Sequence, residues 1–435
     1  MGKSDLDEFG GFKDLRIDKE GFFRVKEYMN RFYFVDPDGN AFIMRGVNYV
    51  RFNADLSVAD GAPYTKNILA KYRSRDEWRR ETRRRLLEWG FNALGAWSDP
   101  DLGLPYTLNL HITPRYYMYK GGYLKRRVLV LARDPDVLWQ PFQTFPDVYD
   151  PDFEKSAVET AREYVVPHDK YLIGYFTDNE VDFSVDTIFT EFMNMHGEEP
   201  GKRALIDYFS KFFSDIRELN NALGTNLGDF DDLLDYSMRE FSVIEAKAGS
   251  RSRRIINELK RGFAREVAKR YAEICVKAIR SADPNHLILG GRFAGTNPKS
   301  VIRSFDAFDV ISNNYYGEDP PIAYFEYVFK ETERPIILSE FSFRAEDTEH
   351  PNTRGAGIIV ENRSYRAFYI RSWLIPLLEK RFFIGYLWWE YMDEPYEGRR
   401  PDAEDSNYGL VNLYDEPYIE VVEVFKDINS MFPIP

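Results

Sequence analysis

The chain has 435 residues, of which 44% are hydrophobic and 30% charged, and this composition predicts a globular protein with a large core. Its formal net charge of −13 disfavours nucleic acid as a partner, because an acidic surface repels the phosphate backbone. A single cysteine, Cys275, excludes an internal disulfide. With only five histidines beside it, a structural zinc site is not expected, and we expect neither a metal nor a cofactor.

The N-terminal residues contain no apolar stretch of the kind that a signal peptide requires. No uncharged run of about 18 apolar residues occurs, so no membrane span is expected. These features predict a cytoplasmic protein without a membrane partner. The sequence leaves the oligomeric state open, and a homo-oligomer is compatible with it.

Short apolar runs alternate with long amphipathic segments, a pattern typical of an α/β fold with a parallel sheet. Eight such runs predict a (β/α)8 barrel, the TIM barrel, as a single catalytic domain over residues 1–435. The expected strands are 43–49, 93–97, 107–113, 171–177, 286–292, 310–314, 335–339 and 384–389. The clearest expected helices are 75–89, with Ser74 as its N-cap, and 254–282.

One segment before the barrel has a different pattern. Residues 21–43 hold two β-rich runs on either side of Asp38-Gly39, which is a signal for a tight turn. We interpret this segment as an N-terminal β-hairpin that closes the bottom of the barrel.

Two connections exceed ordinary loop lengths. Residues 115–150 are expected to be loop-like, and residues 181–253 to form an insertion with helices near 202–219 and 231–248. Because the insertion directly follows the end of the fourth expected strand, it is predicted to overhang the barrel mouth as a lid. An elaboration that serves packing alone is the alternative.

Two carboxylic acids stand at the ends of separate expected strands. The run YLIGYFTDNE ends in Glu180, and RPIILSE ends in Glu340. Sites in barrels are built at the carboxyl ends of strands, and the fourth and seventh strands lie across the mouth from one another. Hydrolysis of a glycoside needs two such carboxyl groups, so Glu180 and Glu340 are the candidate catalytic residues. Asn179, directly before Glu180, is a candidate to bind the sugar 2-OH.

The chain resembles clan A glycoside hydrolases, and within that clan it is most similar to the β-agarase family and its β-galactosidase relatives. The resemblance spans roughly residues 21–395 and rests on RGVN at 45–48, WGFNALGAWSD at 89–99, LIGYFTDNEVDF at 172–183, ILSEFSF at 337–343 and GYLWWEY at 385–391. It implies that Glu180 is the acid/base and Glu340 the nucleophile of a retaining β-glycosidase.

Members of this family usually carry an added carbohydrate-binding domain and act on an extracellular polymer. We find neither that domain nor an export signal, which favours small β-linked oligosaccharides of β-galactoside or agaro-oligosaccharide type as the substrate. A β-glucosidase or β-glucanase of the same clan, and a transglycosidase that shares the covalent intermediate, are the alternatives.

Aromatic residues end two further expected strands. Tyr315 or Tyr316, after the sixth, is a candidate to hydrogen-bond the nucleophile, as the clan resemblance implies; a core tyrosine is the alternative. Trp388 and Trp389 end the eighth strand. Because side chains alternate along a strand, one should face the sugar and the other should pack outward, and we favour Trp388 for the sugar.

Weaker candidates come from the first three strands. Arg45 could hold the nucleophile ionised or bridge to another acid, and Asn48 ends the same strand. Trp97 could line the cleft, and His111 could bind a hydroxyl, although a lone histidine is more often structural. Asp178 is expected to fix a loop.

Three acids, Glu390, Asp393 and Glu394, follow the eighth strand and could recognise sugar hydroxyls, but solvated loop charge is the default interpretation. Two other function classes fit the sequence less well. A metal-dependent hydrolase would place histidine or aspartate clusters at the strand ends, and the fourth and seventh strands offer no histidine. A non-catalytic carbohydrate-binding barrel would be expected to lack one of the two glutamates.

Overall fold

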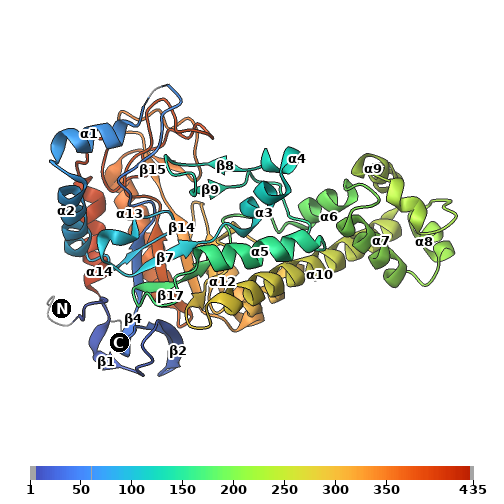
Figure 1. Cartoon of the computed structure of the whole chain (residues 1–435), viewed down its shortest axis with the longest axis horizontal. Coiled ribbons are helices and arrows are strands. Elements are labelled where there is room, and N and C mark those ends of the chain that lie inside the picture. The colour runs from blue at the N-terminus through green and yellow to red at the C-terminus, as the bar shows by residue number, and fades with distance from the viewer. Residues whose placement is uncertain (1–5, 60, 432–435) are drawn as a thin grey trace.

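The computed structural model describes residues 6–59 and 61–431, and its centre is a parallel sheet surrounded by helices (Figure 1). The nine strands of this sheet are β5 (Met44–Val47), β6 (Ala93–Leu94), β7 (Tyr106–Asn109), β10 (Leu172–Phe176), β11 (Leu287–Ile288), β12 (Phe293–Ala294), β13 (Ile311–Asn314), β14 (Ile336–Phe341) and β17 (Phe383–Trp388).

The sheet curls round towards its own edge. Its strand order is β11-β10-β7-β6-β5-β17-β14-β13-β12, and every neighbouring pair is parallel. The first and last strands of that order, β11 and β12, are separated in the chain only by residues 289–292. The backbone N–H of Asp309, just before β13, also donates to the carbonyl of Ile288 in β11 at 3.0 Å. This curled parallel sheet fits a fold of the TIM-barrel type.

The sequences of the strands explain their place in the core. The strands LIGYF, IILSEF and FIGYLW are buried along their whole length, as parallel strands covered on both faces must be. Amphipathic helices supply the outer cover. The helices are α1 (Pro63–Lys71), α2 (Arg75–Glu88), α3 (Ile112–Lys120), α4 (Gly122–Lys125), α5 (Pro151–Tyr164), α6 (Val185–Met193), α7 (Pro200–Phe212), α8 (Ile216–Leu223), α9 (Met238–Lys247), α10 (Ser250–Ala282), α11 (Lys299–Ile302), α12 (Ile322–Thr332), α13 (Arg363–Leu378) and α14 (Ile419–Ser430), with short 3-10 turns η2 (Pro100–Leu102), η3 (Asp231–Asp235) and η4 (Arg303–Ala307).

A small antiparallel sheet precedes the barrel strands. It contains β1 (Phe12–Arg16), β2 (Arg24–Tyr28), β3 (Arg31–Val35) and β4 (Asn40–Phe42), in the order β1-β4-β3-β2. The backbone N–H of Phe32 donates to the carbonyl of Arg381 at 2.8 Å, directly before β17 begins. This hydrogen bond joins the small sheet to the amino end of β17, which is the end opposite the candidate site. The sheet has four strands, whereas the sequence predicted a two-stranded hairpin.

The two long connections differ in part from expectation. Residues 115–150 are not simply a loop, because they contain most of α3, all of α4 and a short hairpin of β8 (Leu129–Val130) and β9 (Leu138–Trp139). Within residues 181–253, the helix expected over 202–219 is broken into α7 and α8, and the side chain of Asp215 caps α8 at its start. Helices α6 to α9 extend sideways along the far end of α10, away from the parallel sheet (Figure 1).

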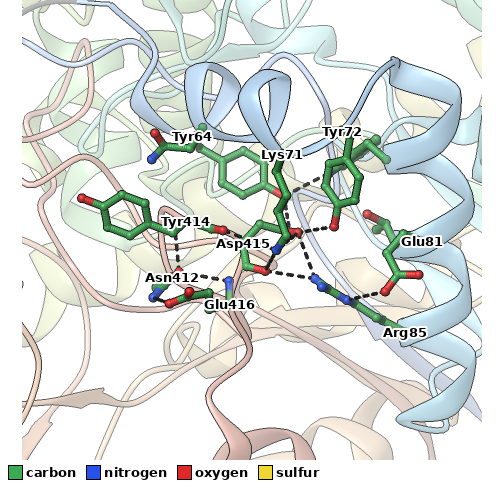
Figure 2. A network of polar contacts seen from close by, with 12 residues as sticks. Tyr64, Lys71, Tyr72, Glu81, Arg85, Asn412, Tyr414, Asp415 and Glu416 are labelled. Carbon is green, nitrogen blue, oxygen red and sulfur yellow. Dashed lines mark hydrogen bonds and ion pairs between the residues drawn. The ribbon is translucent and has the colours of Figure 1, made fainter.

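A buried carboxylate joins the C-terminal part of the chain to the first two helices (Figure 2). Asp415 accepts hydrogen bonds from Tyr64 at 3.0 Å and Lys71 at 3.0 Å, both in α1, and from Tyr72 at 2.5 Å just after it. Arg85 of α2 donates to the same carboxylate at 3.0 Å. Asp415 has no exposed surface, so these donors replace the water that its charge would otherwise require.

One remaining small sheet pairs β15 (Arg344–Ala345) with β16 (Ile359–Val360) beside the barrel mouth. Among the described residues, no helix is both long and apolar enough to cross a membrane.

Candidate active site

A pocket of about 790 Å³, including the solvent at its opening, lies at the carboxyl ends of the parallel strands. Glu180 follows β10 and Glu340 belongs to β14, and both carboxyl groups line the pocket. The full lining consists of Trp97, Leu131, Trp139, Phe142, Asn179, Glu180, Ala294, Gly295, Asn314, Tyr316, Glu340, Ala356, Trp389, Arg399, Asp402, Glu404 and Tyr408.

One amide nitrogen bridges the two candidate catalytic acids. Asn314 Nδ2, at the end of β13, donates to Glu180 Oε1 at 3.0 Å and to Glu340 Oε2 at 3.1 Å. Because both oxygens bond the same nitrogen, they lie no more than about 6 Å apart. The two acids that the sequence places on separate strands therefore face one another across the pocket.

A buried arginine pairs with Glu340. Arg292 has no exposed surface, and its Nη2 donates to Glu340 Oε2 in a short ion pair. Its Nη1 donates to the carbonyl of Ser339 at 2.9 Å and to Asn48 Oδ1 at 3.2 Å. The guanidinium lies over the ring of Trp97 at 5.1 Å. These contacts fix Arg292 in one orientation, which places its charge on one side of the Glu340 carboxylate.

The other side of that carboxylate is held by a tyrosine. The hydroxyl of Tyr316 donates to Glu340 Oε1 at 2.6 Å, and its ring lines the pocket. Tyr315, in contrast, packs against Trp373 with ring centroids 5.9 Å apart and is absent from the pocket lining. Of the two tyrosines predicted from the sequence, the structure thus places Tyr316 on the nucleophile candidate.

The electrostatics of the two acids differ. Burial, and next the charge of Glu340, raise the pKa of Glu180 to about 8. Burial also raises the pKa of Glu340, but the charge of Arg292 and the hydrogen bond from Tyr316 act in the opposite direction. A proton is therefore more stable on Glu180 than on Glu340, the division that an acid and a nucleophile require.

No protein-family model matches the chain. Sequence comparison finds β-agarase A of a Vibrio species, 27% identical in an alignment of 394 positions, gaps included, that covers 84% of this chain and 37% of that protein. It also finds β-agarase B of the same species, 22% identical in an alignment of 497 positions, gaps included, that covers 97% of this chain and 49% of that protein. Both of these relatives are β-agarases.

Structure comparison gives a similar result. An exo-β-agarase superposes with a TM-score of 0.80 at 22% sequence identity, over 99% of this chain and 68% of that structure. At this identity the likeness shows the fold. The similarity to β-agarases that the sequence motifs indicated is thereby confirmed. The chain spans less than half the length of the two curated β-agarases that it matches.

The residue before the acid/base candidate lies in the predicted place. Asn179 lines the pocket, and its Oδ1 accepts hydrogen bonds from Arg292 Nε at 2.7 Å and from Asn314 at 3.2 Å. The oxygen of the amide therefore faces the donors, which orients the amide group and leaves Nδ2 as its donor for a ligand. Asn48 has a different role. It is buried beneath the pocket and bonds Ser339 and Arg292.

The two tryptophans after the eighth strand have the opposite orientation to the one we favoured. Trp389 lines the pocket, where its ring lies edge-on to Trp97 at 5.6 Å. Trp388 has no exposed surface, donates to the carbonyl of Tyr408 at 3.0 Å and packs on Phe425. The preference for Trp388 was therefore wrong. The alternation of side chains along a strand predicted that one of the two tryptophans faces the pocket, but it could not determine which one.

Trp97 reaches the pocket as expected, but His111 does not. His111 is buried behind Trp97, with ring centroids 6.0 Å apart. Burial lowers the pKa of His111 well below its ordinary value, so the ring is neutral. Asp178 fixes local structure, as expected: it accepts from the backbone and hydroxyl of Thr113 at 2.8 and 2.9 Å and from Tyr271 at 2.5 Å.

Arg45 does not hold the nucleophile. It lies near the amino end of the sheet, where its Nη1 donates to the carbonyl of Asn429 at 2.9 Å and its guanidinium lies over the ring of Phe12 at 5.6 Å. Its expected contact with the nucleophile belongs instead to Arg292. The sequence offered one signal for this, because Arg292 is the last residue of the expected fifth strand, 286–292.

The acids after the eighth strand are buried, so their interpretation as solvated loop charge was wrong. Glu394 Oε2 accepts from the backbone of Ser406 at 2.8 Å, and Asp393 accepts from Tyr418 at 2.5 Å. Neither oxygen of Glu390 has a hydrogen-bond partner among the described residues. Burial raises the pKa of Glu390 well above its ordinary value, and the charge of Arg399 acts against that rise.

A charged wall completes the pocket, and sequence reasoning missed it. Arg399, which is 5% exposed, pairs with Asp402 at 2.9 Å and with Glu404 at 2.7 Å, and its guanidinium lies over Trp389 at 5.6 Å. These residues follow the last strand by more than ten positions, so no strand-end rule could locate them. Asn314, which does end an expected strand, was also missed.

The pocket walls settle the expectation about a lid. Residues of 181–253 are absent from the pocket lining, whereas Leu131, Trp139 and Phe142 of the preceding connection contribute to it. The insertion therefore does not cover this pocket. In the described part of the chain, no group of three histidine, cysteine, aspartate or glutamate residues has the arrangement of a metal site.

Proposed function

We propose that this chain is a retaining β-glycoside hydrolase that acts on β-linked oligosaccharides of β-galactoside or agaro-oligosaccharide type. The single observation that carries the proposal is the pairing of Glu180 and Glu340 through Asn314, which limits the distance between Glu180 Oε1 and Glu340 Oε2 to about 6 Å. Retaining glycosidases hold their two carboxyl groups about 5–5.5 Å apart, whereas inverting enzymes need about 6.5–9.5 Å to admit a water molecule. The β-agarase relatives support the substrate class.

In the first step, the ionised Glu340 attacks the anomeric carbon while Glu180 gives its proton to the departing glycosidic oxygen. Arg292 and Tyr316 keep Glu340 ionised before attack and stabilise its charge again when the sugar leaves. In the second step, Glu180 is ionised and takes a proton from water, which attacks the glycosyl-enzyme and releases the sugar with its original configuration. Asn179 is placed to bond the 2-OH, a contact that strengthens in the transition state.

The configuration of the first-formed product tests this proposal. The wild-type chain is mixed with agaro-oligosaccharides, cello-oligosaccharides and aryl β-glycosides, and the anomeric protons are followed by NMR before mutarotation. We expect the β-anomer first. An α-anomer would exclude the retaining mechanism, and hydrolysis that persists in Glu340→Gln would exclude this site. Excess sugar acceptor distinguishes a transglycosidase, because transfer products would then outnumber the hydrolysis product.

A further inference from the structure

Two aromatic side chains form one wall of the pocket and have no part in the chemistry described above. Trp139 belongs to β9, and Phe142 follows it three residues later. Their rings are edge-on to one another with centroids 6.0 Å apart. Phe142 is 52% exposed, so part of its ring is open to a ligand in the pocket.

The chain segment that carries these two rings is hydrogen-bonded to residues on both sides of Glu180 in the sequence. Between the two aromatics, the fully buried Gln140 donates from its side chain to the carbonyl of Asn179, the residue before Glu180. Two residues beyond Phe142, the carbonyl of Thr144 accepts from the backbone N–H of Asp182 at 3.4 Å. The segment 139–144 therefore lies on the Glu180 side of the pocket.

The opposite side of the pocket has a different character. There Trp389 follows β17, the strand that pairs with the β14 strand of Glu340, and Arg399 with Glu404 lies against Trp389. A sugar attacked by Glu340 lies on this side with its hydroxyl groups near charged and amide groups. On the nucleophile side, charged side chains thus accompany the aromatic ring of Trp389, whereas Trp139 and Phe142 line the side of the acid/base.

Chemistry relates these two sides to the two halves of a substrate. The acid/base gives its proton to the oxygen that leaves, so the leaving group lies on the Glu180 side. A pyranose ring has an apolar face of C–H groups, which an aromatic side chain can cover without hydrogen bonds. Resting on the proposed function, we propose that Trp139 and Phe142 form the binding site for the leaving-group sugar, and that this sugar is an uncharged pyranose held by its apolar face.

Two substrates that share a glycone test this site. The first is a β-linked oligosaccharide that the wild-type chain cleaves, and the second is the β-glycosyl fluoride of the same glycone, whose leaving group is too small to reach the aromatic wall. The variants are Trp139→Ala, Phe142→Ala and the double variant. Phe368→Ala is the control, because Phe368 is 61% exposed on α13 and absent from the pocket lining.

We expect the ratio of kcat/KM for the oligosaccharide to kcat/KM for the fluoride to fall tenfold or more in the double variant and to stay at the wild-type value in Phe368→Ala. Transfer of the glycosyl group to added sugar acceptor should fall in parallel, because the acceptor occupies the same place. An unchanged ratio, whether both substrates decline together or neither does, would overturn the proposal. If the wild-type chain cleaves none of the β-linked oligosaccharides and aryl β-glycosides named above, and no glycosyl fluoride, the proposed function is overturned and this inference with it.

Discussion

Arg292 Nε donates to Asn179 Oδ1 at 2.7 Å, while the other end of the same guanidinium bonds Glu340. One buried cation therefore orients the amide beside the acid/base and also lowers the cost of charge on the nucleophile. Its planar shape, with donors in fixed directions, makes both contacts possible at once, and an ammonium group cannot reproduce them.

Arg292→Lys should lower kcat/KM by about 10²-fold or more, because two sets of fixed hydrogen bonds near the reacting atoms are lost. The acidic limb of the pH–rate profile should also move to higher pH, because lysine keeps the positive charge but loses the fixed hydrogen bond by which Arg292 lowers the pKa of Glu340. Arg45→Lys, a buried arginine at the other end of the sheet, is the matched control. An acidic limb that moves equally in both variants would contradict this role for Arg292.

The pH dependence of the wild-type chain should be bell-shaped, with its basic limb near pH 8 in kcat/KM. Glu180 must be protonated to act as an acid, and its pKa is raised to about 8. The charge of Glu404 contributes to that rise, so Glu404→Gln should move the basic limb to lower pH. Glu361→Gln, an exposed position outside the pocket lining, should not move it. A rate that is flat from pH 6 to 9 would exclude Glu180 as the acid.

Substitutions at Trp389 and Trp388 should distinguish an effect on substrate binding from an effect on the stability of the fold. Trp389→Phe should raise KM or lower kcat for oligosaccharides with little change in the denaturation midpoint, because the indole of Trp389 lines the pocket. Trp388→Phe should instead lower stability by about 1–3 kcal/mol, since that side chain is buried and its N–H donates to the carbonyl of Tyr408. Paired kinetics and urea titrations measure both effects, and a loss of activity confined to Trp388→Phe would contradict the placement of Trp389 against the substrate.

The sequence predicted the features of the fold that follow from periodicity. Apolar runs before Glu180 and Glu340 placed β10 and β14 within a residue or two, because strands buried on both faces must be continuous and apolar. The same rule, that strand ends carry the site, located both acids, Asn179 and Tyr316. It would have located Arg292 and Asn314 too, had every strand end been weighed equally.

What could not be predicted depends on long-range packing. Arg399, Asp402 and Glu404 lie in a segment without periodicity, and only the folded chain brings them to Trp389. The direction of the insertion was also beyond the sequence. Its position after β10 favoured a lid, but its helices α6, α7 and α8 pack against α10 and lie away from the parallel sheet.

Asp415→Asn should destabilise the chain without changing its chemistry. The carboxylate accepts from Tyr64, Lys71, Tyr72 and Arg85, so a neutral amide leaves Lys71 without its anion and leaves Arg85 paired with Glu81 alone (Figure 2). We expect a loss of about 2–4 kcal/mol in the free energy of unfolding, measured by urea denaturation. At 25 °C the kcat/KM should stay within twofold of wild type, because Asp415 is absent from the pocket lining. If Asp415→Asn has the same free energy of unfolding as the wild type, the hydrogen bonds and ion pairs of Asp415 make no net contribution to stability.

The roles of the two glutamates can be separated by removing each side chain in turn. Glu340→Ala removes the nucleophile, so no glycosyl-enzyme can form, and activity should fall on every substrate whatever its leaving group. Glu180→Ala removes proton donation, which matters little for aryl glycosides with very acidic phenols. Their first step should survive in this variant, but turnover should be slow, because no base activates the water of the second step.

Azide needs no general base, so it should restore turnover in Glu180→Ala and give a β-glycosyl azide. General acid–base catalysis contributes about 10²–10⁴-fold, so the rescue should be large enough to measure directly. The geometry favours this assignment, because Arg292 and Tyr316 both bond Glu340, whereas Glu180 accepts only from Asn314 among the described residues. Rescue of Glu340→Ala with an α-azide product, together with complete loss in Glu180→Ala, would reverse the two roles. Losses below tenfold in both variants would place the catalytic site elsewhere.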